Sequence, residues 1–228
     1  MSYPKHIDQL IENVSEVDRL LDIHANVSGT APGRRREVEV LNKSALVLLV
    51  ACWESYVEDL AENCFNFMVE HSDSPYVFED HVLAIVAKEV KKRDTHSFWE
   101  IHGDGWKNAI ISNKDEILDK YVVEGSFNTP RKENIDKLYS ELIGFKSISS
   151  TWYWPGQSRT KSVGKLEDMI KLRGEIAHRV RSSKKIHKLR VTNYKDFIYR
   201  LSIIMNNRCS DFIKNKTGKK PWKKYSYR

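Results

Sequence analysis

An arginine and a histidine five positions apart lie in one helical segment and could do chemistry together. The segment runs from Leu166 to Arg181, and the two residues are Arg173 and His178. An imidazole takes up and releases protons close to neutral pH, whereas a guanidinium carries a permanent charge on a rigid fork of donors. The pair is therefore a candidate for proton transfer beside a bound anion.

Helical geometry separates the two side chains. Residues five positions apart leave an α-helix roughly 140° from each other, so one helix cannot easily aim Arg173 and His178 at a single atom. Two copies facing each other across a twofold axis could do so, and so could a helix that loosens near His178. Gly174 costs about 1 kcal/mol relative to alanine inside a helix. We interpret it as a point where another helix or a ligand phosphate approaches the backbone.

The elements that position this segment are predicted to be helices. Apolar residues recur at three- and four-residue steps nearly throughout the chain, and no stretch shows strand alternation. We expect an all-α bundle with two long central helices and shorter peripheral ones, forming one domain over residues 1–215, followed by a basic, flexible tail over residues 216–228. The expected helices span residues 5–26, 36–70, 76–90, 106–123, 130–143, 163–179 and 192–214, with Thr192 as the cap of the last one.

The composition excludes several classes of protein. With 228 residues, 40% hydrophobic and 30% charged, the chain is neither collagen-like nor disordered throughout. The longest apolar run, Ala45–Trp53, has nine residues and is too short to span a bilayer. It is apolar all round at its centre, which predicts burial on every side. No secretory signal is visible, so we expect a cytoplasmic protein without a membrane role. No metal-ligand or phosphate-loop motif is present, and we expect no cofactor.

Positive charge is concentrated in the last quarter of the chain. Residues 171–228 hold 18 Lys and Arg against 3 acids, a net charge of +15, whereas residues 1–170 have a net charge of −8. Such a segment suits a polyanionic partner, and the alternative is a solvated basic face. Trp154 could stack on a base. The candidate phosphate contacts are Arg34, Arg35, Arg36, Arg179, Arg181, Lys184, Lys185 and Lys188.

The segment Arg173-Gly-Glu-Ile-Ala-His178 resembles the signature of the HEPN-domain ribonucleases, an Arg followed after four to six residues by a His. Residues 41–60, which include Trp-Glu54-Ser-Tyr-Val-Glu58, are similar to the corresponding helix of the RiboL-PSP-associated HEPN subgroup. The Trp152-Tyr-Trp-Pro-Gly loop is similar to that subgroup as well. The resemblance covers most of residues 30–205 and implies a HEPN-like bundle. The chain departs from the pattern at Gly174, where many members carry a polar residue, and at Arg179, where glycine is frequent.

The resemblance implies a metal-independent endoribonuclease. In that chemistry the RNA 2′-hydroxyl attacks its own phosphate, leaving a 2′,3′-cyclic phosphate and a 5′-hydroxyl. His178 would act as acid and base, Arg173 would stabilise the charge that develops on the phosphate, and Glu54 could orient either of them. The family also implies a homodimer with a composite active site, and a toxin–antitoxin or phage-defence setting with a neutralising protein partner.

Other interpretations of the same residues stay open at this point. Arg173 could pair with a buried acid while His178 caps a helix end, and Glu54 could be an exposed acid paired with Lys43 or a neighbour. The whole protein could be a HEPN module that binds RNA without cleaving it, or a helical module that binds another protein. Cleavage of RNA in the presence of EDTA separates the nuclease from the first of these. A salt titration separates binding of RNA from binding of a protein.

Overall fold

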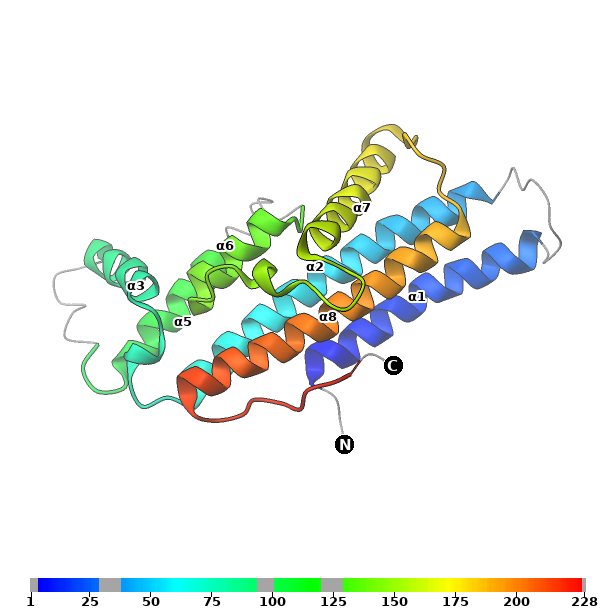
Figure 1. Ribbon diagram of the computed structural model, residues 1–228. Coiled ribbons are helices and arrows are strands. Elements are labelled where there is room, and N and C mark those ends of the chain that lie inside the picture. Colours follow the sequence, from blue (N-terminus) through cyan, green and yellow to red (C-terminus); the bar gives the residue numbers. More distant parts are fainter. Residues whose placement is uncertain (1–3, 29–37, 94–100, 120–128, 227–228) are drawn as a thin grey trace. The chain divides into compact units, whose positions relative to one another are not determined.

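The chain is helical almost throughout in the computed structural model, which describes residues 4–28, 38–93, 101–119 and 129–226 (Figure 1). No strand occurs among these residues, and the only β-type pairing in them is an isolated bridge between Trp154 and Gln157. The prediction of an all-α bundle is confirmed. The helices are α1 (Lys5–Ser28), α2 (Glu39–Glu70), α3 (Asp80–Arg93), α5 (Gly105–Leu118), α6 (Lys132–Ile143), α7 (Arg159–Arg179) and α8 (Lys188–Thr217), with 3-10 turns at Pro75–Val77 and Ile148–Thr151.

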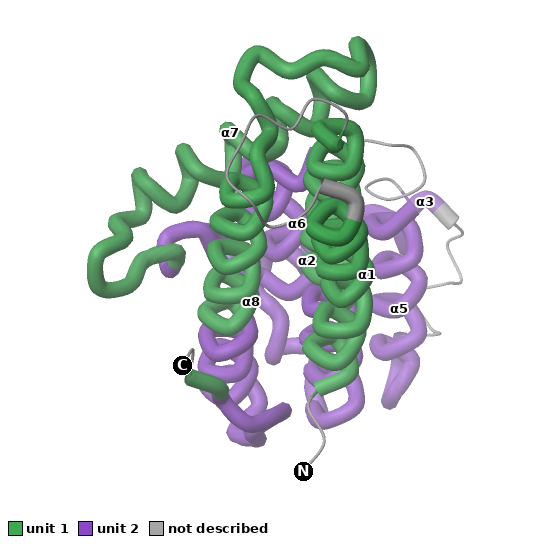
Figure 2. The backbone as a smooth tube through the Cα atoms, turned by 90° about the vertical axis from the view of Figure 1, so that its right-hand side faces the viewer, with its two compact units in different colours: residues 1–59, 152–205, 225–228 green, residues 60–151, 206–224 purple. Residues whose placement is uncertain are grey.

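The chain divides into two compact units, coloured separately in Figure 2. Unit 1 comprises residues 1–59, 152–205 and 225–228, and unit 2 comprises residues 60–151 and 206–224. The long helices α2 and α8 are each divided between the units, with residues up to 59 of α2 and up to 205 of α8 in unit 1 and the rest in unit 2. The proposal that residues 1–215 behave as one domain stays a prediction.

Unit 1 is built on α1, the first part of α2, α7 and the first part of α8. Tyr56 of α2 donates a hydrogen bond from its hydroxyl to the Ser202 carbonyl of α8 at 2.6 Å, and the His6 ring of α1 meets the Tyr56 ring edge-on. Trp53 and Trp152 are fully buried and pack at a centroid distance of 6.4 Å. These large side chains form an apolar centre in unit 1.

Unit 2 contains α3, α5 and α6, which pack on one another, with the remaining parts of α2 and α8. Gly144 ends α6 in the left-handed conformation, where a side chain would collide with Glu79. The tail expected to be flexible, residues 216–228, begins inside α8, which ends at Thr217. The Trp222 indole nitrogen donates to the Asn206 carbonyl at 3.2 Å, and Lys224 pairs with Asp211 at 2.5 Å. Its flexibility stays a prediction.

The centre of α2, Ala45–Ala51, is not buried on every side, contrary to the prediction. Leu46, Leu49 and Val50 are buried, but Ala51 is exposed and Val40, near the start of the helix, is 60% exposed. Val47 and Leu48 are half-buried. The uncovered positions follow the 3.6-residue period, so they form one stripe along α2. Sequence pattern shows that a segment is apolar all round, but packing decides which sides find a neighbour.

The same helix is the one element in the described ranges that could cross a bilayer by length and composition. Its most apolar 18-residue window has a mean hydropathy of 1.3, and half of that window is buried inside the protein. The core helix of a protein outside membranes passes the same test. A cytoplasmic location stays a prediction.

Candidate functional site

Helix α7 carries the arginine–histidine motif, and both of its ends are defined by local interactions. At the start, the Ser158 hydroxyl accepts a hydrogen bond from the Lys161 amide at 3.3 Å, so the helix begins four residues before its expected start at Val163. At the other end, Val180 turns into the left-handed conformation with φ of 56°. A β-branched residue adopts this conformation only under strain. The chain therefore leaves the helix abruptly, two residues after His178.

Arg173 is half-buried and lies beside Glu54 of α2. Burial raises the pKa of the Glu54 carboxyl, and the Arg173 charge opposes that rise. No acid of the described residues forms a salt bridge with Arg173, so its guanidinium is near a carboxylate without being engaged by it. Lys43 pairs with Glu39 at 3.3 Å, and no salt bridge joins Glu54 to Lys43 in the described residues. The guanidinium thus remains available to oxygens of a ligand.

His178 is exposed in the last turn of α7, two residues before the strained end of the helix. A histidine at this end of a helix faces the negative end of the helix dipole. The Val180 carbonyl accepts a hydrogen bond from Lys43 of α2 at 3.2 Å, which ties this end of α7 to α2. Within one chain, the helix still directs Arg173 and His178 roughly 140° apart. The structure therefore leaves the imidazole open to solvent and the guanidinium turned toward α2.

The loop that follows His178 is held by three groups that the sequence pattern did not single out. The Glu175 carboxylate accepts hydrogen bonds from the Ser183 amide at 2.6 Å and from its hydroxyl at 3.0 Å. The buried Asn42 side chain of α2 donates to the Ile186 carbonyl at 3.1 Å. The third group is Asp168, through its contact with Lys184. Asp168 and Glu175 come from α7 itself, so the loop is folded back along the helix that carries the motif.

The predicted phosphate contacts fall into three groups. Arg179, at the end of α7, and Arg181 and Lys185, in the loop after it, are exposed. Lys184 is bound to Asp168 at 2.5 Å, and Lys188 donates to the Leu21 carbonyl of α1 at 3.1 Å, so both have structural partners. The remaining candidates, Arg34, Arg35 and Arg36, lie outside the described residues.

Trp154 is half-buried, and one of its faces has a partner within the protein. The Arg200 guanidinium lies 5.2 Å from the centre of its ring, and the Phe197 ring lies 6.1 Å away. A base could therefore stack only on a part of the indole that Arg200 and Phe197 leave uncovered. Its role as a stacking platform stays a prediction.

Glu58 is a residue of this region that was not predicted as part of a site. It lies one helical turn after Glu54 on α2 and is half-buried. Burial raises its pKa to about 7, and the charges of Glu54 and Asp59 add to the rise. A carboxyl that titrates near neutral pH can exchange protons under working conditions. In the sequence, the four-residue spacing of Glu54 and Glu58 places both on one face of the helix. Only the burial seen in the structure shows that the pKa of Glu58 is raised. No three His, Cys, Asp or Glu side chains of the described ranges are grouped so as to hold a metal ion.

Comparison with models of known protein families identifies the family of this chain. The family model described as RiboL-PSP-HEPN matches residues 8–211, which include most of α1, all of α2 and α7, and most of α8. The chain belongs to the RiboL-PSP-HEPN family. The searches of curated proteins and of solved structures found no match. Membership in a HEPN family supports a nuclease or another RNA-related function for the RiboL-PSP-HEPN chain, and it confirms the resemblance found in residues 41–60 and 173–178.

Proposed function

We propose that this RiboL-PSP-HEPN protein is an endoribonuclease that cleaves RNA without a metal ion, using His178 and Arg173. The observation that carries the proposal is the state of the two side chains on α7. Arg173 is half-buried beside Glu54 and has no salt bridge within the described residues, and His178 is exposed at the end of the same helix. A half-buried arginine with a purely structural role would be expected to have its charge and donors satisfied within the chain.

In the proposed reaction, the RNA 2′-oxygen attacks the adjacent phosphorus as His178 accepts the 2′-hydroxyl proton. The bond from phosphorus to the 5′-oxygen breaks, and an imidazolium supplies the proton that the leaving oxygen takes up. The products are a 2′,3′-cyclic phosphate and a 5′-hydroxyl. Acid–base catalysis of this kind typically contributes about 10²–10⁴ in rate. Arg173 offers paired donors to the non-bridging oxygens as charge accumulates on them, and Glu54 positions that guanidinium.

The active site is proposed to be completed by a second copy of the chain. Helical geometry separates Arg173 from His178 on one α7, whereas a twofold axis can bring the arginine of one copy toward the histidine of another. The uncovered apolar stripe of α2, which includes Val40, Val47 and Ala51, supports this arrangement because it runs toward Glu54. A second copy that covers the stripe would remove this apolar surface from water.

The experiment is to incubate RNA with the purified protein in EDTA and to analyse the ends of the fragments. Wild-type protein should leave 2′,3′-cyclic phosphates and 5′-hydroxyls, whereas His178→Ala and Arg173→Ala should each lose at least about 10²-fold in rate. His102→Ala is the matched control, because His102 is an exposed histidine in unit 2. Full cleavage by the His178→Ala protein would end the proposal.

Mixing the two inactive variants tests the composite site separately. If each site takes its arginine from one copy and its histidine from the other, a heterodimer of Arg173→Ala and His178→Ala retains one intact site. Random exchange of subunits should then restore about one quarter of wild-type activity, since half of the dimers are mixed and each has one of two sites. No recovery after complete exchange would show that both groups act within one chain.

The alternative is a HEPN module that binds RNA without cleaving it, and the exposed cations Arg179, Arg181 and Lys185 favour this second candidate. It predicts a mobility shift of intact RNA that weakens steeply with salt. For the nuclease, the proposed setting is a toxin–antitoxin or phage-defence system in the cytoplasm, with RNA as target and a neutralising protein as partner. Growth arrest on expression that depends on His178 would support that setting.

A further inference from the structure

A partly covered face of α2 carries two carboxyls of unit 1 that lie one helical turn apart. The face contains, at three- and four-residue steps, Val47, Ala51, Glu54 and Glu58. Glu54 and Glu58 are both half-buried. Side chains four positions apart on a helix have Cβ atoms about 5–6 Å from each other. The two carboxyls are therefore within reach of each other.

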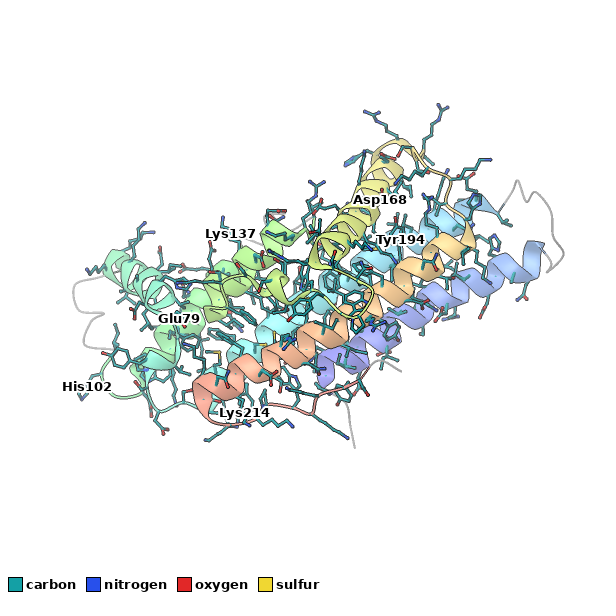
Figure 3. The ribbon with its side chains drawn as sticks, in the orientation of Figure 1. Glu79, His102, Lys137, Asp168, Tyr194 and Lys214 are labelled. Atoms are coloured by element: carbon teal, nitrogen blue, oxygen red, sulfur yellow. The ribbon has the colours of Figure 1, made fainter. Side chains whose placement is uncertain are left out.

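Neither of these carboxyls has a salt bridge in the described part of the chain, whereas other acids of α2 and α7 are engaged by a neighbouring side chain. The engaged acids are Asp59 with Ser55 at 3.4 Å, Glu62 with Lys114 at 3.0 Å, and Asp168 with Tyr194 at 2.7 Å, the last pair being labelled in Figure 3. A carboxylate that is half removed from water without a partner lowers stability. A purely structural role therefore does not account for Glu54 and Glu58.

The surrounding charges favour the ionised form of Glu54 over that of Glu58. Burial raises the pKa of Glu54, and Arg173 of α7 opposes that rise. For Glu58, burial and charge act in the same direction, because Glu54 and Asp59 add to the rise that brings its pKa to about 7. Below neutral pH, Glu58 is thus the member of the pair that holds a proton.

A protonated carboxyl has a hydrogen-bond donor that an ionised one lacks. The O–H of a neutral Glu58 can be donated to a Glu54 oxygen one turn away, which leaves the other Glu54 oxygen for Arg173. A hydrogen bond to an ionised acceptor is shorter and stronger than one between neutral groups. Such a bond would fix the orientation of the carboxylate that faces the arginine of the proposed nuclease site.

We propose that Glu58 is a positioning residue of that site, whose neutral carboxyl donates a hydrogen bond to Glu54 and keeps Glu54 directed at Arg173. The inference rests on the proposed function and adds a group that acts through Glu54 without touching RNA. Loss of the Glu58 proton removes the donor and leaves two carboxylates that repel each other. The Arg173 guanidinium is then held less firmly against the phosphate, and cleavage slows.

The test compares Glu58→Gln, whose amide keeps a donor in place of the acid O–H, with Glu58→Leu, which has none. At pH 6, kcat/KM for RNA in EDTA should be about tenfold higher for Glu58→Gln than for Glu58→Leu, because a hydrogen bond to an ionised acceptor contributes at least about this factor. At pH 8.5 wild type should have lost most of its advantage over Glu58→Leu, whereas Glu58→Gln should keep its own. Titration of His178 affects all three proteins alike, so it cancels in these ratios.

Glu70→Leu is the matched control, since Glu70 is an exposed glutamate at the end of the same helix. This protein should follow wild type at both pH values.

A second measurement does not depend on cleavage. A deca-adenylate with 2′-O-methyl groups lacks the attacking hydroxyl, and its affinity for the full-length proteins is measured by fluorescence anisotropy at pH 6. Glu58→Gln should bind this probe severalfold more tightly than Glu58→Leu. In the Arg173→Ala background the two should bind alike, because Glu58 is proposed to act through that arginine.

The two measurements separate the inference from the proposed function. If the probe binds in the expected order but no RNA is cut, the nuclease activity fails and the role of Glu58 stands. If RNA is cut but Glu58→Gln and Glu58→Leu share one rate at both pH values, the inference is overturned and the nuclease stands. Parallel pH profiles of wild type and Glu58→Gln overturn the inference as well, and the absence of both cleavage and binding overturns both.

Discussion

Replacing Gly174 by alanine should stabilise the protein and at the same time impair cleavage of RNA. Gly174 lies inside α7, where alanine is favoured over glycine by about 0.8–1.0 kcal/mol. A Cβ built on Gly174 meets no atom within 4 Å in the described chain, so no collision offsets this gain. For a protein of this size the unfolding temperature should rise by roughly 2–4 °C. Thermal unfolding followed by circular dichroism measures the shift.

Activity should change in the opposite direction, because of where the new methyl group points. On an ideal helix it projects roughly 100° from Arg173 and 40° from His178, between the directions of the two proposed catalytic side chains. No atom of the described residues needs the small size of glycine there, and the prediction is that an approaching RNA or a second copy of the chain does. Since a displacement of about 1 Å can cost 10²-fold in rate, we expect cleavage to fall at least tenfold.

Gly164→Ala is the matched control. Gly164 lies on the same helix, and its added Cβ also meets nothing within 4 Å. This variant should gain stability on the scale of Gly174→Ala and keep wild-type cleavage. If Gly174→Ala cleaves RNA as fast as Gly164→Ala, no ligand or partner approaches the backbone at position 174, and the reasoning is refuted.

Three further substitutions test the region around the motif. Val180→Gly should stabilise the protein by about 1 kcal/mol in urea unfolding, because Val180 is 72% exposed and glycine removes the strain of its positive φ; an unchanged or lower stability would contradict this. Burial raises the pKa of Glu58 to about 7, so the folded protein binds the proton of this carboxyl more tightly than the unfolded chain does. The free energy of unfolding therefore falls as the pH rises from about 4.5 through 7. At pH 8 the Glu58→Gln protein should therefore have a free energy of unfolding about 1 kcal/mol above that of wild type, after allowing for partial exposure. Near pH 4.5 this difference should disappear. An equal gain at both pH values would exclude titration of Glu58 as the cause. Asn42→Ala removes the buried hydrogen bond to the loop after His178 and should lower the free energy of unfolding by about 1–2 kcal/mol. The affinity for RNA, measured by a mobility-shift assay, should fall as well. An affinity equal to that of wild type would show that the loop does not contact RNA.

Local sequence patterns predicted the helices well and their ends less well. The start of α8 shows why. Thr192 was expected to cap this helix, but α8 begins at Lys188, and the Thr192 hydroxyl donates back to the Lys188 carbonyl at 3.2 Å. Threonine can bond to the backbone either at a cap or inside a helix, and the residue type does not distinguish the two. The early start adds residues 188–191 to the helix.

The sequence by itself determined the all-α fold, the helix that carries Arg173 and His178, and the family of the chain. Each of these depends on patterns that repeat within a few residues, or on a motif that is contiguous in one helix. Tertiary structure alone decided that Glu54 lies beside Arg173, that Lys184 is bound to Asp168, and that α2 keeps an uncovered stripe. These outcomes depend on which faces of distant helices meet, and helical periodicity specifies a face without specifying its neighbour.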